Sequence, residues 1–219
     1  MAVFELKNSK AIGDLPLQCR DVIKRYKDEG MFDIDSITNG KQEYTTVYFL
    51  MTQDCNLRCA YCYQPKEFRQ KDSGIKQDVI DATMDWVSRT FDERKIKFSI
   101  FGGEPFLNFP MLKYLCETYC MYRYVVTTNG LILLENQDVR DWVLKHKYHL
   151  NLSVSVSALR SKFGKSYLNK VKPLLDLVIS NGGDVHYVVD DPEREFVYEE
   201  IVWLYEYGVP IVRVSSARH

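Results

Sequence analysis

Three cysteines that lie close together carry the clearest chemistry in this sequence, because Cys55, Cys59 and Cys62 are spaced C-x3-C-x2-C. Thiolates are soft ligands, and three of them form a set that suits iron or zinc. Closed structural zinc sites and self-sufficient four-iron clusters use four protein ligands, and no fourth ligand is evident nearby. The spacing therefore indicates a metal centre with one open coordination position, where a substrate or cofactor would bind. A zinc knuckle that borrows a distant ligand and three buried thiols are the alternatives that these residues leave open.

Two turns and a row of serines are further candidates for ligand contact. In Gly102-Gly103-Glu104-Pro105, adjacent glycines let the backbone approach a ligand closely, and Glu104 provides a carboxylate for a cation. Thr128-Asn129-Gly130 follows a β-branched run. Ser153, Ser155 and Ser157 alternate along a third run, so a strand would place them on one face. The alternatives are ordinary turns and serines with a structural role.

A repeated strand–helix pattern must position these residues. Hydrophobic periodicity predicts strands at residues 44–51, 95–101, 124–128, 151–157, 185–189 and 210–214. Helices are expected at residues 75–94, from Pro110 onward, at residues 137–145, at residues 168–180 and between Asp191 and Gly208. Alternation of this kind indicates an α/β fold with parallel strands and right-handed crossovers, either an open sheet or a partial barrel. Both place ligand chemistry at the carboxyl ends of the strands, where the cysteines, the two turns and the serines fall.

The cysteine spacing also resembles the radical S-adenosylmethionine (radical SAM) superfamily, whose C-x3-C-x-aromatic-C motif is matched including the aromatic residue, Tyr61. The resemblance implies a partial (β/α)6 barrel and a [4Fe–4S] cluster held by Cys55, Cys59 and Cys62. In that family the open iron chelates the amino and carboxylate groups of S-adenosyl-L-methionine. One electron then cleaves the sulfonium, and the resulting 5′-deoxyadenosyl radical abstracts hydrogen from a substrate.

The same resemblance implies roles for residues outside the cysteine motif. Tyr61 is expected near the adenine, and Gly102, Gly103 and Glu104 at the methionine amine. Asn129 and Ser155 are expected at the ribose or carboxylate of the cofactor. Ser157 is a further cofactor-facing candidate, although Ser155-Val156-Ser157-Ala158 departs from the usual Ser-x-Asp-Gly of the branch.

The motifs are closest to the core domain of the maturase branch, which comprises sulfatase-maturating and peptide-modifying enzymes. This resemblance implies a peptide or protein substrate and an electron donor such as flavodoxin or ferredoxin. No cysteine follows Cys120, so the cysteine-rich extension of many maturases is not present; the sequence is a minimal core or a fragment. An activase that places a glycyl radical on a partner enzyme, and a non-catalytic protein with a structural or sensory three-cysteine metal site, are the alternative functions.

Composition bounds the domain organisation and the partners. Residues 1–43 are expected to form an N-terminal appendage with a helix at residues 15–27, and residues 44–219 the core domain. The net charge of −1 gives no sign of attraction to nucleic acid. We expect no membrane span and no secretory leader, because apolar runs are short and the N-terminus soon becomes charged. Cysteine usage unlike that of a secreted disulfide scaffold indicates a reducing cytoplasm.

Arg213 and a second pair of cysteines have less specific interpretations. Arg213 either points into the cavity and pairs with a carboxylate or is a solvated charge, and the second is preferred. Cys116 and Cys120 are four residues apart on a predicted helix and would share a face, but no third ligand is near in sequence.

Overall fold

The computed structural model describes residues 3–5, 10–12, 45–62, 64, 74–91, 95–189 and 197–217. The chain divides into two compact units, residues 1–47 and 48–219. In the first unit, β1 (Val3–Glu5) and β2 (Lys10–Ile12) form an antiparallel hairpin. The helix expected at residues 15–27 and the expected boundary at residue 44 both fall outside the described residues, so they stay predictions.

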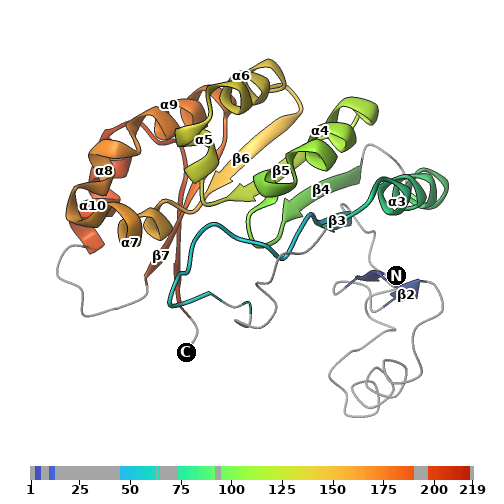
Figure 1. The fold of residues 1–219 in the computed structure, drawn as a ribbon, viewed down its shortest axis with the longest axis horizontal. Coiled ribbons are helices and arrows are strands. Elements are labelled where there is room, and N and C mark those ends of the chain that lie inside the picture. The colour runs from blue at the N-terminus through green and yellow to red at the C-terminus, as the bar shows by residue number, and fades with distance from the viewer. Residues whose placement is uncertain are drawn as a thin grey trace, which may run out of the picture. The chain divides into compact units, whose positions relative to one another are not determined.

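A six-stranded sheet forms the centre of the fold (Figure 1). Its strands follow chain order: β3 (Thr45–Leu50), β4 (Ile96–Phe101), β5 (Tyr124–Thr128), β6 (Leu150–Val154), β7 (Asp184–Val189) and β8 (Val212–Ser216). The pairings from β4 to β8 are parallel. Within the described residues no pairing joins β8 back to β3, so the sheet stays open. The α/β fold predicted as a partial (β/α)6 barrel is confirmed.

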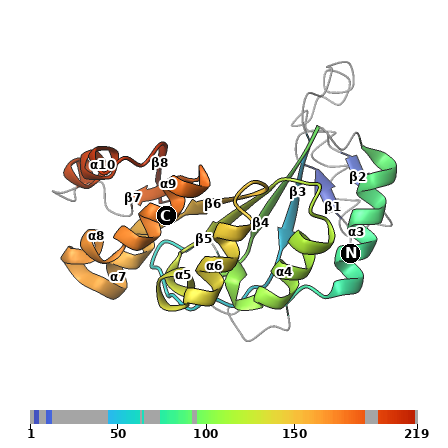
Figure 2. The ribbon, with the colours of Figure 1, turned by 90° about the horizontal axis from the view of Figure 1, so that it is seen from above.

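The longer helices connect successive strands and lie along one side of the sheet, as Figures 1 and 2 show for α4, α6 and α9. Their bounds are α3 (Gln77–Thr90), α4 (Phe109–Thr118), α6 (Gln137–Lys145), α9 (Lys172–Asn181) and α10 (Val197–Glu206). Pro173 lies in the first turn of α9, where its missing N–H is harmless, and Gly182 ends that helix in the left-handed conformation at φ 66°. No described helix is both long and apolar enough to cross a membrane.

Alternation along each strand separates the apolar core from the opposite face of the sheet. Side chains that face the helices are fully buried, including Phe98, Tyr124, Leu152 and Tyr187. The other face is more polar in β6 to β8, where Ser153, Asp184 and Arg213 contact one another. The side of the sheet under the helices is therefore apolar and packed, and the opposite side is more polar from β6 to β8.

The fourth strand ends earlier than predicted. β6 stops at Val154, and residues Val156–Leu159 form the 3₁₀ helix η4. The backbone N–H of Ser155 still bonds to the carbonyl of Thr128 at 2.8 Å, but Ala158 then donates to the carbonyl of Ser155 and closes a turn. The prediction that Ser153, Ser155 and Ser157 share one face of a strand is therefore wrong.

Several short helices were not predicted from the sequence. They are η3 (Pro105–Asn108), α5 (Leu131–Glu135), α7 (Arg160–Phe163) and η5 (Gly164–Ser166), whereas the helix expected at residues 168–180 is divided into α8 (Tyr167–Lys170) and α9. Each of the unpredicted helices has five residues or fewer, which is too short to show helical periodicity. Two of them, η3 and α5, directly follow the strand-end turns and so help to position those turns.

Candidate functional site

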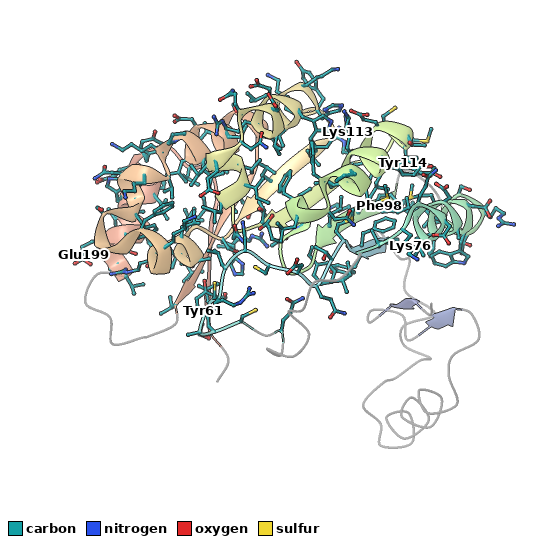
Figure 3. The ribbon with its side chains drawn as sticks, viewed as in Figure 1. Tyr61, Lys76, Phe98, Lys113, Tyr114 and Glu199 are labelled. Atoms are coloured by element: carbon teal, nitrogen blue, oxygen red, sulfur yellow. The ribbon has the colours of Figure 1, made fainter. Side chains whose placement is uncertain are left out.

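The cysteine loop follows β3 and is shaped by its own polar groups. Thr52 Oγ1 accepts a hydrogen bond from the N–H of Asp54 at 3.0 Å, and Asp54 Oδ1 accepts one from the N–H of Cys55 at 3.2 Å. The N–H of Cys62 donates to the carbonyl of Cys59 at 3.2 Å, so a turn holds these two residues together. All three cysteines are half-buried and free of disulfides. Tyr61 lies on this loop, away from α6 and α9 (Figure 3).

The glycine-rich turn after β4 packs directly against the start of the cysteine loop. Gly103 donates its N–H to the carbonyl of Thr52 at 2.9 Å, and Glu104 donates its N–H to the carbonyl of Asp54 at 2.8 Å. A Cβ at Gly102 would lie 2.2 Å from the carbonyl oxygen of Thr52, and one at Gly103 would lie 2.1 Å from that of Asp54. The close approach that we predicted toward a ligand is thus made to the chain's own backbone, and contact of these glycines with a cofactor stays a prediction.

Glu104 is fully buried and joins the ends of β4 and β5. Its Oε1 accepts from the N–H of Phe106 at 3.2 Å and from Oγ1 of Thr128 at 2.7 Å, and its Oε2 accepts from the N–H of Asn129 at 2.9 Å. Burial raises the pKa of this carboxyl to about 7, although the three hydrogen bonds oppose the shift. A carboxylate offers about four acceptor positions, so these bonds leave one on Oε2.

Asn129 connects the end of β5 with the cysteine loop. Its Oδ1 accepts from the N–H of Leu131 at 2.9 Å. Its Nδ2 donates to Oδ1 of Asn56 at 2.8 Å and lies 3.8 Å from the sulfur of Cys55. One hydrogen-bond network therefore contains Glu104, Asn129 and Cys55, which the sequence places in three separate motifs.

The thiol of Cys55 is in an environment that disfavours a bare thiolate. Burial raises its pKa, while a hydrogen bond from the N–H of Leu57, at 3.5 Å, acts in the opposite direction. The negative charges of Glu104 and Cys62 raise the pKa further. A bound metal cation would reverse this balance, because it favours the deprotonated thiol.

The donor set around this thiol fits an iron–sulfur cluster. Three thiols without disulfide bonds lie on one loop, and N–H donors of Leu57 and Asn129 face the sulfur of Cys55. No three Cys, His, Asp or Glu side chains are preassembled as a metal site in the part of the chain that the structure describes. Metal sites of this kind often form only when the metal binds, so we expect cluster binding to bring the three sulfurs together.

The two serines after β6 have different surroundings. Ser157 is buried, and its Oγ accepts from the N–H of Val188 in β7 at 3.0 Å. Ser155 is half-buried and is held beside the Thr128 turn through its backbone. The structure therefore brings Ser155 to the strand ends that carry the other motifs, whereas the hydroxyl of Ser157 supports the sheet.

Two polar clusters near the C-terminal strands contain partners that the sequence did not identify. Arg213 donates from Nη2 to Oδ1 of Asp184 at 2.7 Å and to Oγ of Ser153 at 2.5 Å, so it pairs with a carboxylate, which was the less favoured of its two interpretations. Glu200 is buried against Arg160, Tyr167 and Tyr187. The sequence did contain a signal for the second cluster, because Glu200 is a charged residue within the apolar stripe of α10, where a buried partner is required. The first depends on strand register, for which the sequence has no signal.

The family comparison covers the cysteine loop, the turns after β4 and β5 and the serines after β6, but not β7, α10 or β8. The model of a family described as a 4Fe–4S single cluster domain matches residues 39–167, more than half of the chain. A GTP 3′,8-cyclase of Campylobacter jejuni subsp. doylei is 29% identical over 136 residues, which cover 59% of this chain and 39% of that protein. A GTP 3′,8-cyclase of Haemophilus ducreyi is 27% identical over 140 residues, which cover 60% of this chain and 38% of that protein.

Solved structures with a similar fold include two that hold ligands. The structure of anSMEcpe with bound AdoMet has a TM-score of 0.63 at 17% identity, covering 80% of this chain and 51% of that chain. Streptococcus suis SuiB bound to precursor peptide SuiA has a TM-score of 0.63 at 16% identity, covering 94% of this chain and 46% of that chain. The chain thus spans about two fifths of the curated relatives and about half of the solved chains. Together with the motifs, the family match shows that the chain belongs to the 4Fe–4S single cluster domain family and is a member of the radical SAM superfamily.

Proposed function

We propose that this chain is the core of a radical SAM enzyme in which Cys55, Cys59 and Cys62 hold a [4Fe–4S] cluster and S-adenosyl-L-methionine binds beside it. The observation that carries the proposal is the network from Cys55 through Asn129 to Glu104. Three motifs from three successive strand ends meet there, at the edge of the sheet where parallel α/β folds bind ligands.

The cluster and its cofactor would supply a 5′-deoxyadenosyl radical after one-electron reduction, and the chain's own residues hold and shield the reactants. Glu104 has one acceptor position left on Oε2 for the ammonium group of the cofactor. The ring of Tyr61 suits the adenine, and the hydroxyl of Ser155 suits the ribose or carboxylate. Gly102 and Gly103 keep the cysteine loop against β4, so that the cluster ligands stay close to these groups.

We infer that the substrate is a peptide or protein side chain and that the electron comes from a flavodoxin or ferredoxin. The likeness in fold to SuiB, solved with a precursor peptide, and to anSMEcpe, solved with AdoMet and the Cp18Cys peptide, supports a peptide. The face of the sheet opposite the helices offers both apolar and polar contacts to a peptide, because Tyr48 is 61% exposed and Arg213 lies beside Asp184. The described cysteines form no disulfide, which suits a reducing compartment such as the cytoplasm.

The test is anaerobic reconstitution with iron and sulfide, followed by EPR of the reduced protein with and without S-adenosylmethionine. We expect a [4Fe–4S]⁺ signal that changes when the cofactor is added, and formation of 5′-deoxyadenosine. Both should be lost in Cys59→Ala and retained in Cys120→Ala, because Cys120 is an exposed cysteine outside the motif. Zinc in place of iron, or a cluster indifferent to the cofactor, would contradict the proposal. Conversion of GTP by the reconstituted protein would contradict the peptide substrate.

A further inference from the structure

We propose that Asn129 is a positioning residue for the cluster: its side-chain amide donates a hydrogen bond to the sulfur of Cys55 and thereby raises the reduction potential of the cluster. This inference rests on the proposed function only in requiring that Cys55 is a cluster ligand. It gives Asn129 a role different from the cofactor contact that the family resemblance implies.

The orientation of the Asn129 amide is settled by its partners. The N–H of Leu131 points at the amide from 2.9 Å, and of the two ends of a side-chain amide only the oxygen, Oδ1, can accept a hydrogen bond. The NH₂ group must therefore face the cysteine loop, where it meets Oδ1 of Asn56 at 2.8 Å and the sulfur of Cys55 at 3.8 Å. A flipped Asn129 amide would place its oxygen against Oδ1 of Asn56, so that two acceptors would meet. It would also place its NH₂ group against the N–H of Leu131, so that two donors would meet.

The backbone around Asn129 holds that amide in place. Its own N–H is bonded to Oε2 of Glu104 at 2.9 Å, and the next N–H, of Gly130, is bonded to Oγ1 of Thr128 at 2.9 Å. Gly130 has φ 76°, and a Cβ there would lie 2.3 Å from Cδ2 of Leu174. Asn129 is only 8% exposed. The amide therefore has little freedom to turn away from the cysteine loop.

The remaining hydrogen-bonding capacity of Asn129 is small. Both N–H groups of Nδ2 have acceptors in Asn56 and Cys55, and one lone pair of Oδ1 is used by Leu131. The sulfur of Cys55 has a second donor in the N–H of Leu57 at 3.5 Å. Hydrogen bonds to ligand sulfurs help to set cluster potentials. They favour the reduced state, because it places more negative charge on the sulfur than the oxidised state does.

The direct test is a redox titration by EPR of the reconstituted protein without S-adenosylmethionine, comparing the wild type with Asn129→Leu. Leucine has a similar volume and no donor, so the potential should shift to a lower value. In the wild type, isotopic labelling of asparagine nitrogen should also produce a weak nitrogen coupling to the reduced cluster. Asn56→Ala should keep that coupling, because it leaves the amide–sulfur bond intact. Asn136→Leu, at the exposed cap of α6, controls for the loss of an asparagine elsewhere and should leave the potential unchanged.

Three outcomes separate this inference from its competitors. An unchanged potential in Asn129→Leu together with weaker binding of S-adenosylmethionine would make Asn129 a cofactor contact and overturn the inference. If Asn129→Leu does not fold, the labelling measurement on the wild type still decides, and absence of an asparagine coupling overturns the inference. Failure of the wild type to assemble any iron–sulfur cluster would instead refute the proposed function.

Discussion

Glu104 is a carboxylate whose described hydrogen-bond partners are all uncharged. Two backbone N–H groups and one hydroxyl surround it at the meeting point of β4 and β5. Its burial explains why the pKa rises to about 7 in spite of these bonds. A cation that approached Oε2 would lower the pKa of this carboxyl again. Glu104 is therefore suited to bind a positively charged group, and no described hydrogen bond to it comes from a charged side chain.

The raised pKa of Glu104 predicts how stability depends on pH. Because the folded pKa of about 7 exceeds the ordinary 4.5, the native state binds more protons than the unfolded state between these values. The unfolding free energy of the cluster-free protein should therefore fall as pH rises through this window, by up to roughly 3 kcal/mol. Glu104→Gln should remove this slope, whereas Glu135→Gln, at an exposed position, should keep it. Urea denaturation across the window measures the effect, and an equal slope in Glu104→Gln would contradict it.

The different surroundings of Ser155 and Ser157 predict different consequences of the same change. Ser157→Ala removes the acceptor for the N–H of Val188 and leaves that group without its partner, which typically costs about 1–3 kcal/mol. Ser155→Ala removes a hydroxyl with no hydrogen bond among those described, so stability should be nearly unchanged while S-adenosylmethionine binds more weakly. Urea denaturation and equilibrium binding to the reconstituted protein measure the two effects. Weaker cofactor binding in Ser157→Ala at unchanged stability would reverse the assignment.

At the scale of elements, strands with strong β-branched runs were predictable and the segment after β6 was not. β5 has the predicted bounds, and β4 differs by one residue from the expected 95–101. Alternating serine and valine at residues 153–157 has the period of a strand. The chain nevertheless forms a turn there, in which the N–H of Ala158 donates to the carbonyl of Ser155. Such a competition depends on tertiary contacts such as Ser157 with Val188, for which local sequence has no signal.

The candidate site was predictable as a set of positions but not as a set of contacts. Parallel strands bring the cysteine loop, Glu104 and Asn129 to one edge of the sheet, and this follows from element order alone. That Asn129 faces Cys55 and that Gly103 faces Asp54 depends on loop conformations of a few residues. Motif resemblance therefore locates the site, and only the structure shows which residues contact the chain itself.

The turn after β4 should not accept a side chain at Gly103. A Cβ there would lie 2.1 Å from the backbone oxygen of Asp54, so Gly103→Ala must displace the cysteine loop. Both the unfolding free energy and the iron content after reconstitution should fall. Gly164→Ala is the matched control, because nothing lies within 4 Å of its Cβ and only its backbone conformation, φ 69° and ψ −159°, opposes the change, by about 1–3 kcal/mol. Full iron content and smaller destabilisation in Gly103→Ala than in Gly164→Ala would contradict the tight packing.

At the scale of the whole second unit, two polar networks hold different parts of the sheet. The network of Glu104 and Asn129 joins the ends of β4 and β5 to the cysteine loop. The network of Glu200 joins α10 to β7, α7 and α8 through Tyr187, Arg160 and Tyr167. Burial and the neighbouring carboxylate raise the pKa of Tyr187 to about 12, so this hydroxyl remains a donor at neutral pH. The first network can therefore carry chemistry while the second closes the C-terminal half of the sheet.

This division predicts that Glu200→Gln weakens the fold without altering the cluster site. Arg160 and the two tyrosine hydroxyls all donate to the carboxylate of Glu200, and a glutamine nitrogen can accept from none of them. Loss of one partner of a buried ion pair typically costs about 3–5 kcal/mol, and the midpoint of urea denaturation should fall accordingly. The EPR signal of the reconstituted cluster should keep its shape at low urea, because no member of this network touches the cysteine loop in the described contacts.

Glu199→Gln is the matched control, since Glu199 is the exposed neighbour on α10 and points away from the sheet (Figure 3). It should leave the urea midpoint unchanged. An altered cluster signal in Glu200→Gln at full native occupancy would show that the two networks are coupled. In that case the C-terminal half of the sheet would take part in shaping the cluster site, and the separation of roles argued from the hydrogen bonds would fail.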